Sequence, residues 1–201
     1  LHDGATAGGK TLDAFSGSNE VVATGSTTAR SLANRFADVV NVKDYGAVAD
    51  GAYGTTEWDG TNNTTAFQAA IDSLSNGGVV YIPQGVYKLD ATVSLKPGIR
   101  LEGAGRYSFG NATSAFSATQ GNGGTGIIVA DGITAFDFDN AGTFVANCSI
   151  ENMTLFGQVV SDTAFGSVPS YRSNTHGINA NRAAELTVYQ LDLISLDKGI
   201  Y

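Results

Sequence analysis

The sequence predicts a mostly β fold whose short strands repeat along the chain. Two observations support this prediction. The 201 residues include 26 glycines and only 3 prolines, and so many glycines without a three-residue period favour tight turns between strands over a helical bundle. Beyond Gly78, apolar and polar residues alternate, and an eight-residue pattern recurs, as expected of stacked strands.

Composition narrows the function classes. The formal net charge is −8, with 15% charged residues spread along the chain, so nucleic acid, which requires a basic surface, is not an expected partner. No apolar run reaches the length of a membrane span, so membrane insertion is not expected either. One cysteine, Cys148, and two isolated histidines, His2 and His176, predict no internal disulfide, no metal site and no cofactor.

Residues 1–39 are expected to form a lead that is separate from the repeating part. Residues 1–26 are small, polar and glycine-rich without a sustained period, which indicates an extended segment. Ser26 or Thr27 then caps a predicted short helix. Its apolar residues share one stripe: Leu32, Phe36 and Val39. A helix of about three turns is marginal alone, so this stripe must pack on something.

The segment VNVKDYGAVADG, residues 40–51, opens the second part. Val40 and Val42 alternate as in a strand, and the residues that follow are typical of turns. The segment contains two carboxylates, Asp44 and Asp50, and the question is whether they act in chemistry. Turn formation is the favoured interpretation, because aspartate commonly hydrogen-bonds the backbone of tight turns.

A second helix is predicted in TTAFQAAIDSLSNGG, residues 64–78. Asn63 or Thr64 is positioned as its cap, and Gly77 and Gly78 end it. Its apolar residues fall at helical spacing: Phe67, Ala70, Ile71 and Leu74.

An internal repeat follows. Cys148–Leu155 and Leu186–Leu193 show the same alternation, and in both the phase slips by one residue at an amide, Asn152 or Gln190. A slip of one residue returns the next side chains to the inner face after a bend. We therefore predict equivalent, stacked strands with Ile150 and Val188 as inward neighbours. Two unrelated strands of a sandwich are the alternative.

The chain resembles the N-terminal part of the pectate-lyase-like, right-handed parallel β-helix superfamily, and within it the tailspikes of bacteriophages. The stretches that carry the resemblance are TGSTTARSLANRFADVV, VNVKDYGAVADG, TNNTTAFQAAIDSLSNGGVVYIPQGVYKL and KPGIRLEGAGR. Two features depart from it. Asn62 and Asn63 stand where the family often has an acidic pair, and the loop 52–60 is an insertion. The shared motif identifies a fold and leaves the reaction open.

The resemblance implies an all-β fold, a right-handed parallel β-helix with an N-terminal α-helical cap. Residues 40–201 would form the cap and the first coils and continue beyond residue 201. The implied protein is a homotrimeric tailspike of the virion. It would be attached to phage tail or baseplate proteins through an upstream anchor, and it would bind and degrade a bacterial surface polysaccharide as a glycosidase or lyase. A non-catalytic tail fibre module and a secreted pectinase-like enzyme are the alternatives.

The candidate catalytic residues are Asp137, Asp139 and Glu151. Glycoside cleavage uses two carboxyl groups or a base, and Asp137 and Asp139 are spaced to share the outward face of one strand. A solvated strand face is the competing and favoured interpretation. Trp58 and Tyr107 are candidates for stacking on sugar rings, with packing on their own domain as the alternative. We expect this chain alone to lack activity, because a groove is assembled from several consecutive coils.

Overall fold

The computed structural model describes residues 20–53, 57–108, 123–139, 144–158, 174–194 and 196–201. The chain divides into two compact units, Leu1–Val39 and Val40–Tyr201. Within the described residues, no helix is long and apolar enough to cross a membrane.

The described part of the first unit is a small hairpin followed by one helical turn. Strand β1 (Glu20–Val22) pairs antiparallel with β2 (Ala29–Ser31), and α1 spans Leu32–Phe36. Ser31 caps this helix by accepting a hydrogen bond from the Asn34 amide at 3.1 Å. The prediction of a longer helix that begins at Ser26 or Thr27 is therefore wrong, because pairing with β1 holds the residues of β2 extended.

The apolar stripe of the first unit faces solvent. Phe36 is 73% exposed and Val39 is 52% exposed. None of the residues 20–39 is buried. An exposed ion pair, Arg30 to Asp38 at 2.8 Å, closes the helix region onto the strand, and such a pair adds little stability.

Strand β3 (Val39–Asn41) begins at the last residue of the first unit, and a 3₁₀ turn, η2 (Val42–Tyr45), follows it in the second unit. The turn ends at Gly46, whose φ of 92° lies in the left-handed region that glycine adopts without strain. A short antiparallel pair follows, β4 (Ala52–Tyr53) with β5 (Trp58–Asp59).

The two aspartates of this segment differ in what they contact. Asp50 accepts hydrogen bonds from the Thr61 amide at 2.8 Å and the Thr61 hydroxyl at 2.6 Å. These bonds lower the pKa of the Asp50 carboxyl, because they favour its charged form. Asp50 thus ties the turn to the segment before α2, which confirms a structural role. Asp44 lies within η2.

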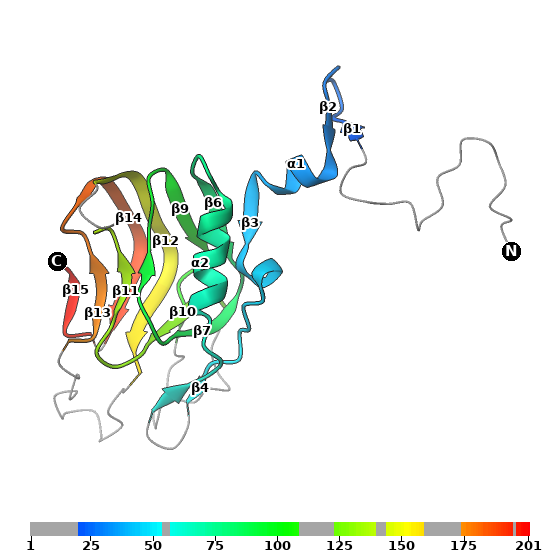
Figure 1. Cartoon of the computed structure of the whole chain (residues 1–201). Coiled ribbons are helices and arrows are strands. Elements are labelled where there is room, and N and C mark those ends of the chain that lie inside the picture. The colour runs from blue at the N-terminus through cyan, green and yellow to red at the C-terminus, as the bar shows by residue number, and fades with distance from the viewer. Residues whose placement is uncertain (1–19, 54–56, 109–122, 140–143, 159–173, 195) are drawn as a thin grey trace, which may run out of the picture. The chain divides into compact units, whose positions relative to one another are not determined.

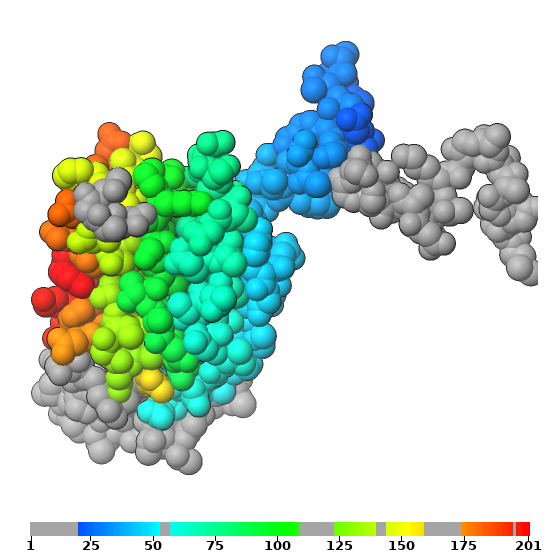
Figure 2. Space-filling view, in the orientation of Figure 1, coloured from blue at the N-terminus to red at the C-terminus, as the bar shows by residue number. Residues whose placement is uncertain are grey.

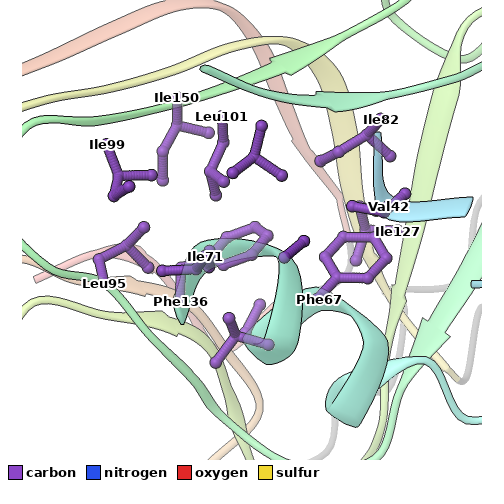
Figure 3. Packing of buried hydrophobic residues seen from close by; sticks show 14 of the residues in the cluster. Val42, Phe67, Ile71, Ile82, Leu95, Ile99, Leu101, Ile127, Phe136 and Ile150 are labelled. Carbon is purple, nitrogen blue, oxygen red and sulfur yellow. The ribbon is translucent and has the colours of Figure 1, made fainter. Parts of the chain in front are cut away.

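Helix α2 (Thr64–Ser73) buries its apolar face in the core of the second unit. Phe67 and Ile71 are fully buried, and Figure 3 shows their side chains among those of Ile82, Leu95 and Ile127. The prediction of the helix and of its stripe is therefore confirmed.

The remaining strands form long parallel ladders (Figure 1). Their bounds are β6 (Gly78–Ile82), β7 (Gly85–Leu89), β8 (Val93–Ser94), β9 (Ile99–Gly103), β10 (Thr125–Val129), β11 (Thr134–Asp137), β12 (Val145–Gly157), β13 (His176–Asn179), β14 (Ala183–Ile194) and β15 (Lys198–Ile200). Three rows result: β6–β9–β12–β14, β7–β10–β12–β14 and β8–β11–β13–β15. Within the second unit, the colours of Figure 2 run in successive bands, because each turn of the chain lies beside the previous one.

Strand β12 belongs to two rows because it bends. Its first half pairs with β9, and its second half pairs with β10. The bend lies at Asn152, whose φ is 58°, and β14 has a matching bend at Gln190, with φ of 47°. A residue with positive φ turns the strand and shifts its alternation by one. A Cβ at Gly103 would collide with the carbonyl oxygen of Asn152, so glycine is required beside this bend.

The predicted repeat is confirmed. Cys148 through Leu155 pair in parallel register with Leu186 through Leu193, and Ile150 lies opposite Val188. Ile150 is fully buried in line with Leu101 and Val80 on the preceding strands. Val188 is 37% exposed, because in the described residues β14 has a paired strand on one side only.

Candidate functional site

The carboxylates of FDFDN are bound into a turn. Strand β11 ends at Asp137, so Asp139 lies beyond the strand and not on its face as expected. Asp137 Oδ1 accepts hydrogen bonds from the Asp139 amide at 2.8 Å and from Asn179 Nδ2 at 2.9 Å. Because Asp137 and Asn179 are also register partners on β11 and β13, this carboxylate links one coil to the next.

Asp139 makes an ion pair with the next coil. Its Oδ1 lies 2.9 Å from Arg182 Nε, and both side chains are more than a third exposed. Phe136 and Phe138, which alternate with the two aspartates, are fully buried. The two phenylalanines thus point inward as predicted. The two aspartates instead stabilise the turn and connect it to the next coil.

Trp58 and Tyr107 lie in a small apolar cluster outside the second row of strands. Trp58 is 1% exposed and Tyr107 is 8% exposed. The Trp58 ring meets Phe156 edge to face, with centroids 5.0 Å apart, and Tyr107 stacks on Phe156 at 6.2 Å. The cluster is completed by Val86 and Ile128. Both candidate rings therefore pack on their own domain in this structure.

A hydrogen-bond pair fixes Tyr107 in that place. Its amide donates to the hydroxyl oxygen of Thr154 at 3.0 Å, and the same hydroxyl donates to the Tyr107 carbonyl at 3.1 Å. Thr154 is itself buried. Its hydroxyl therefore satisfies both the amide and the carbonyl of Tyr107, which would otherwise lack hydrogen-bond partners within this buried cluster.

Glu151 belongs to a different site. It lies on the outward face of β12, while Asp137 ends β11 and Asp139 follows that strand, in another row. The structure therefore does not bring Glu151 together with the FDFDN carboxylates. Its neighbour in register on β9 is Glu102, and its neighbour on β14 is Tyr189.

Four outward side chains line up across four strands, and we call them the outer row. They are Tyr81 of β6, Glu102 of β9, Glu151 of β12 and Tyr189 of β14. Parallel neighbours in a sheet are about 4.8 Å apart, so the row spans roughly 14 Å. Two carboxylates thus lie side by side between two tyrosines.

Arg100 connects the two carboxylates of the outer row. Its Nη2 lies 3.0 Å from Glu151 Oε2 and 3.3 Å from Glu102 Oε2. The Glu151 side chain is 15% exposed, that of Glu102 is 33% exposed, and that of Arg100 is 44% exposed. One cation therefore holds both carboxylates in fixed positions and leaves this group of three with one net negative charge.

The chemistry of the outer row suits polyhydroxylated ligands. Ionised carboxylates accept hydrogen bonds from hydroxyl groups, and a guanidinium donates them. Tyrosine offers an apolar ring with a polar end, and Tyr189 is 57% exposed. Because the row stands on paired strands, its side chains are held at regular spacing without a loop.

The sequence alone identified Glu151 as a candidate, but not Tyr81, Glu102 or Tyr189. Arg100 and Glu102 alternate with Ile99 and Leu101 in GIRLEG, which indicates that they point outward. Their meeting with Glu151 depends on the register of β9 against β12, and local alternation carries no information on that pairing.

His176, the second histidine of the chain, lies at the start of β13, in a different row of strands from the outer row. His176 Nδ1 is 3.9 Å from Asp197 Oδ2, and its ring meets Tyr201 edge to face at 4.9 Å between centroids. Across the described ranges, no three or more histidine, cysteine, aspartate or glutamate side chains are grouped so that they could hold a metal ion.

Comparison with known proteins agrees with the ladders of parallel strands. A family described as rhamnogalacturonase A/epimerase, pectate lyase-like, matches residues 39–197. The chain belongs to this family. The match covers the second unit from β3 to the segment before β15, so it includes the outer row and the FDFDN turn.

Individual relatives match a shorter part of the chain. A mannuronan C5-epimerase, AlgE3 of Azotobacter vinelandii, is 40% identical over 78 residues, which are 34% of this chain and 4% of that protein. A rhamnogalacturonase A of Aspergillus niger is 45% identical over 58 residues, which are 29% of this chain and 11% of that protein. The chain thus spans a small part of the length of these curated relatives.

Among solved structures, the chain is similar to a protein of Geobacillus virus E2, ORF18. The TM-score is 0.50 at 22% sequence identity, and the alignment covers 81% of this chain and 26% of the phage protein. This likeness concerns the fold. The mostly β architecture with curled parallel sheets is therefore shared with a phage protein.

Proposed function

We propose that this chain is the N-terminal part of a bacteriophage tailspike that binds a bacterial surface polysaccharide and, in full length, degrades it. The observation that carries this proposal is the outer row, which presents two tyrosines and two fixed carboxylates on a rigid parallel sheet. Membership of a pectate-lyase-like family and a fold shared with a phage protein support it. Such a protein would reside in the virion, attached to tail proteins by a segment upstream, and act at the bacterial surface.

In this proposal the parallel rows form a right-handed β-helix with α2 as its end cap. Parallel strands joined by crossovers are right-handed in nearly all known cases. A solenoid end exposes apolar core and unpaired strand edges, so it needs a cover. Helix α2 fits that role, because Phe67 and Ile71 enter the core beside the first strands.

The proposal includes a homotrimer assembled through the first unit. The unit's described residues include none that is buried, and Val22, Phe36 and Val39 are at least half exposed. A two-stranded hairpin with one helical turn is not stable alone in water. Three copies that converge on a threefold axis would bury these side chains. Sedimentation of the intact protein as a stable monomer would contradict the trimer.

The function is tested by binding and turnover with the full-length protein. We expect it to adsorb to host cells, to compete with the phage for adsorption, and to release new reducing ends from the isolated surface polysaccharide. Adsorption without release of reducing ends favours the alternative of a non-catalytic fibre module. Turnover of plant pectin without binding to any bacterial surface would favour the secreted enzyme and refute the tailspike.

A further inference from the structure

We propose that the outer row selects an uncharged bacterial glycan and disfavours polymers of uronic acids. This inference rests on the proposed polysaccharide binding and names the substrate class of the same surface. It departs from what the name of one relative implies, because mannuronan is a polymer of a uronic acid. The physical basis is the charge of the row and the way in which that charge is fixed.

The first step is the charge balance of the surface. Glu102 and Glu151 contribute two negative charges, and Arg100 is engaged by both of them. In the second row, beyond the bend at Gln190, Asp192 of β14 is paired with Arg106 at 3.1 Å. Across these two groups, the described side chains leave one net negative charge and no cation without a carboxylate partner. The chain as a whole carries −8.

The second step is the effect of this charge on a ligand. A polymer of uronic acids carries a carboxylate on every unit, so it would place negative charge against Glu102 and Glu151 wherever it lay along the row. Like charges at such close range repel each other, and the group of Glu102, Glu151 and Arg100 keeps a net negative charge that repels an anionic ligand. A neutral glycan meets no such repulsion.

The third step is the attraction that remains for a neutral sugar. Glu102 is one strand away from Tyr81, and Glu151 is one strand away from Tyr189. A sugar ring over either tyrosine would rest its C–H face on the aromatic ring and could donate a hydroxyl hydrogen to the adjacent carboxylate. The pattern is symmetric about the two carboxylates, which suits an oligosaccharide laid across the strands.

The occupant is therefore a short neutral segment of a bacterial glycan. The experiment presents the full-length protein to an array of bacterial surface oligosaccharides, both neutral and uronate-containing. The neutral glycan that binds best is then titrated against variants. We expect Tyr81→Ala and Tyr189→Ala each to weaken binding roughly tenfold or more, as for aromatic residues that contact a partner directly. The matched control is Tyr45→Ala, which removes a 38% exposed tyrosine outside the row.

Charge variants test selectivity directly. The double variant Glu102→Gln with Glu151→Gln leaves Arg100 without a carboxylate partner, so it should gain affinity for uronate-containing glycans. The control double variant, Asp44→Asn with Asp72→Asn, makes the same charge change on η2 and α2 and should not. Gain in the control as well would mean that net charge alone sets the preference, which would overturn the assignment to the row.

The outcomes separate this inference from the proposed function. If uronate-containing glycans bind the unaltered protein best and Tyr189→Ala abolishes that binding, neutral selectivity is refuted while polysaccharide binding stands. Neutral binding that all tyrosine variants retain would place the site elsewhere and refute the assignment to the row. If no glycan of either class binds, both the inference and the proposed function fail.

Discussion

The bend at Asn152 can be tested by replacing this residue with valine and with glycine. At the bend the glycine variant should be the more stable of the two, whereas at an ordinary strand position the valine variant should be. Asn152 has a φ of 58°, and its carbonyl accepts a hydrogen bond from the Gly105 amide at 3.0 Å. Register partners on both sides of the bend, Glu151 with Glu102 and Thr154 with Gly126, hold it in place. The backbone therefore cannot relax to negative φ without loss of pairing.

The magnitude follows from the conformation. A Cβ in the left-handed region costs about 1–2 kcal/mol, and a β-branched side chain is restricted further. Asn152→Val should lower the free energy of unfolding by about 2 kcal/mol. Asn152→Gly removes the Cβ and should stay within about 1 kcal/mol of the unaltered protein, because the greater chain entropy of glycine opposes the relief of strain.

The assay is urea unfolding of the full protein, with the midpoint compared at constant slope. Ser149 is the control, because it lies three residues earlier on the outward face of β12. There, Ser149→Val should be more stable than Ser149→Gly, since strands favour β-branched residues. The same order of valine and glycine at both positions would refute the left-handed bend.

Three further predictions concern the core, the repeat and the FDFDN turn. Burial raises the pKa of Tyr87 to about 12, so its contribution to stability is complete below about pH 10 and is lost as the pH rises through 12. Tyr87→Phe should flatten that loss in unfolding titrations, and an unchanged loss would contradict the burial of this hydroxyl. Leu191 is partly buried against the core, so Leu191→Asp should cost several kcal/mol by placing a charge against apolar side chains, and a cost below about 1 kcal/mol in the same titrations would contradict its inward position. Asp137→Asn keeps the Oδ1 acceptor, so the full protein should retain its release of reducing ends. The 201-residue chain alone should show none, and turnover that Asp137→Asn abolished would make this residue catalytic.

Local sequence patterns were sufficient to predict those parts of the fold that depend only on residues close together in the chain. The slip of alternation at Asn152 and Gln190 predicted both bends, because a strand that turns must change the phase of its inward residues. The helix of residues 64–73 was predicted from its apolar stripe. Both features depend on neighbours within a few residues.

Features that depend on distant pairing were not predicted. The hairpin of β1 with β2 replaced the start of the expected first helix, although that stretch has an acceptable helical pattern. Further bends at Asn147 and Glu185, with φ of 56° and 57°, were not predicted, because alanines at 146, 183 and 184 blur the contrast between inward and outward positions. The outer row required the register of four strands, which no single strand encodes.

The amide of Asn63 offers a last test, because it shows why this chain departs from the acidic pair expected before α2. Asn63 is 1% exposed. Its Oδ1 accepts from the Val48 amide at 2.6 Å, while its Nδ2 donates to the carbonyls of Val48 at 3.0 Å and Thr61 at 2.7 Å. A carboxylate has the same shape and can make only the first of these bonds.

Asn63→Asp would therefore place a buried negative charge against two carbonyl oxygens, and we expect a loss of about 2–5 kcal/mol in the free energy of unfolding at neutral pH. Burial beside two acceptors raises the pKa of the introduced carboxyl above its ordinary value. The penalty is thus present above that pKa and shrinks as the pH falls through it, since the protonated group can donate to one carbonyl.

The matched control is Asn62→Asp. Asn62 Oδ1 accepts from the Thr64 amide at 2.9 Å in an exposed position before the helix, where a carboxylate accepts equally well and favours the helix N-terminus. Equal destabilisation by the two substitutions, or a penalty at position 63 that does not change between pH 7 and pH 4, would show that the donated hydrogen bonds of Asn63 do not hold this segment.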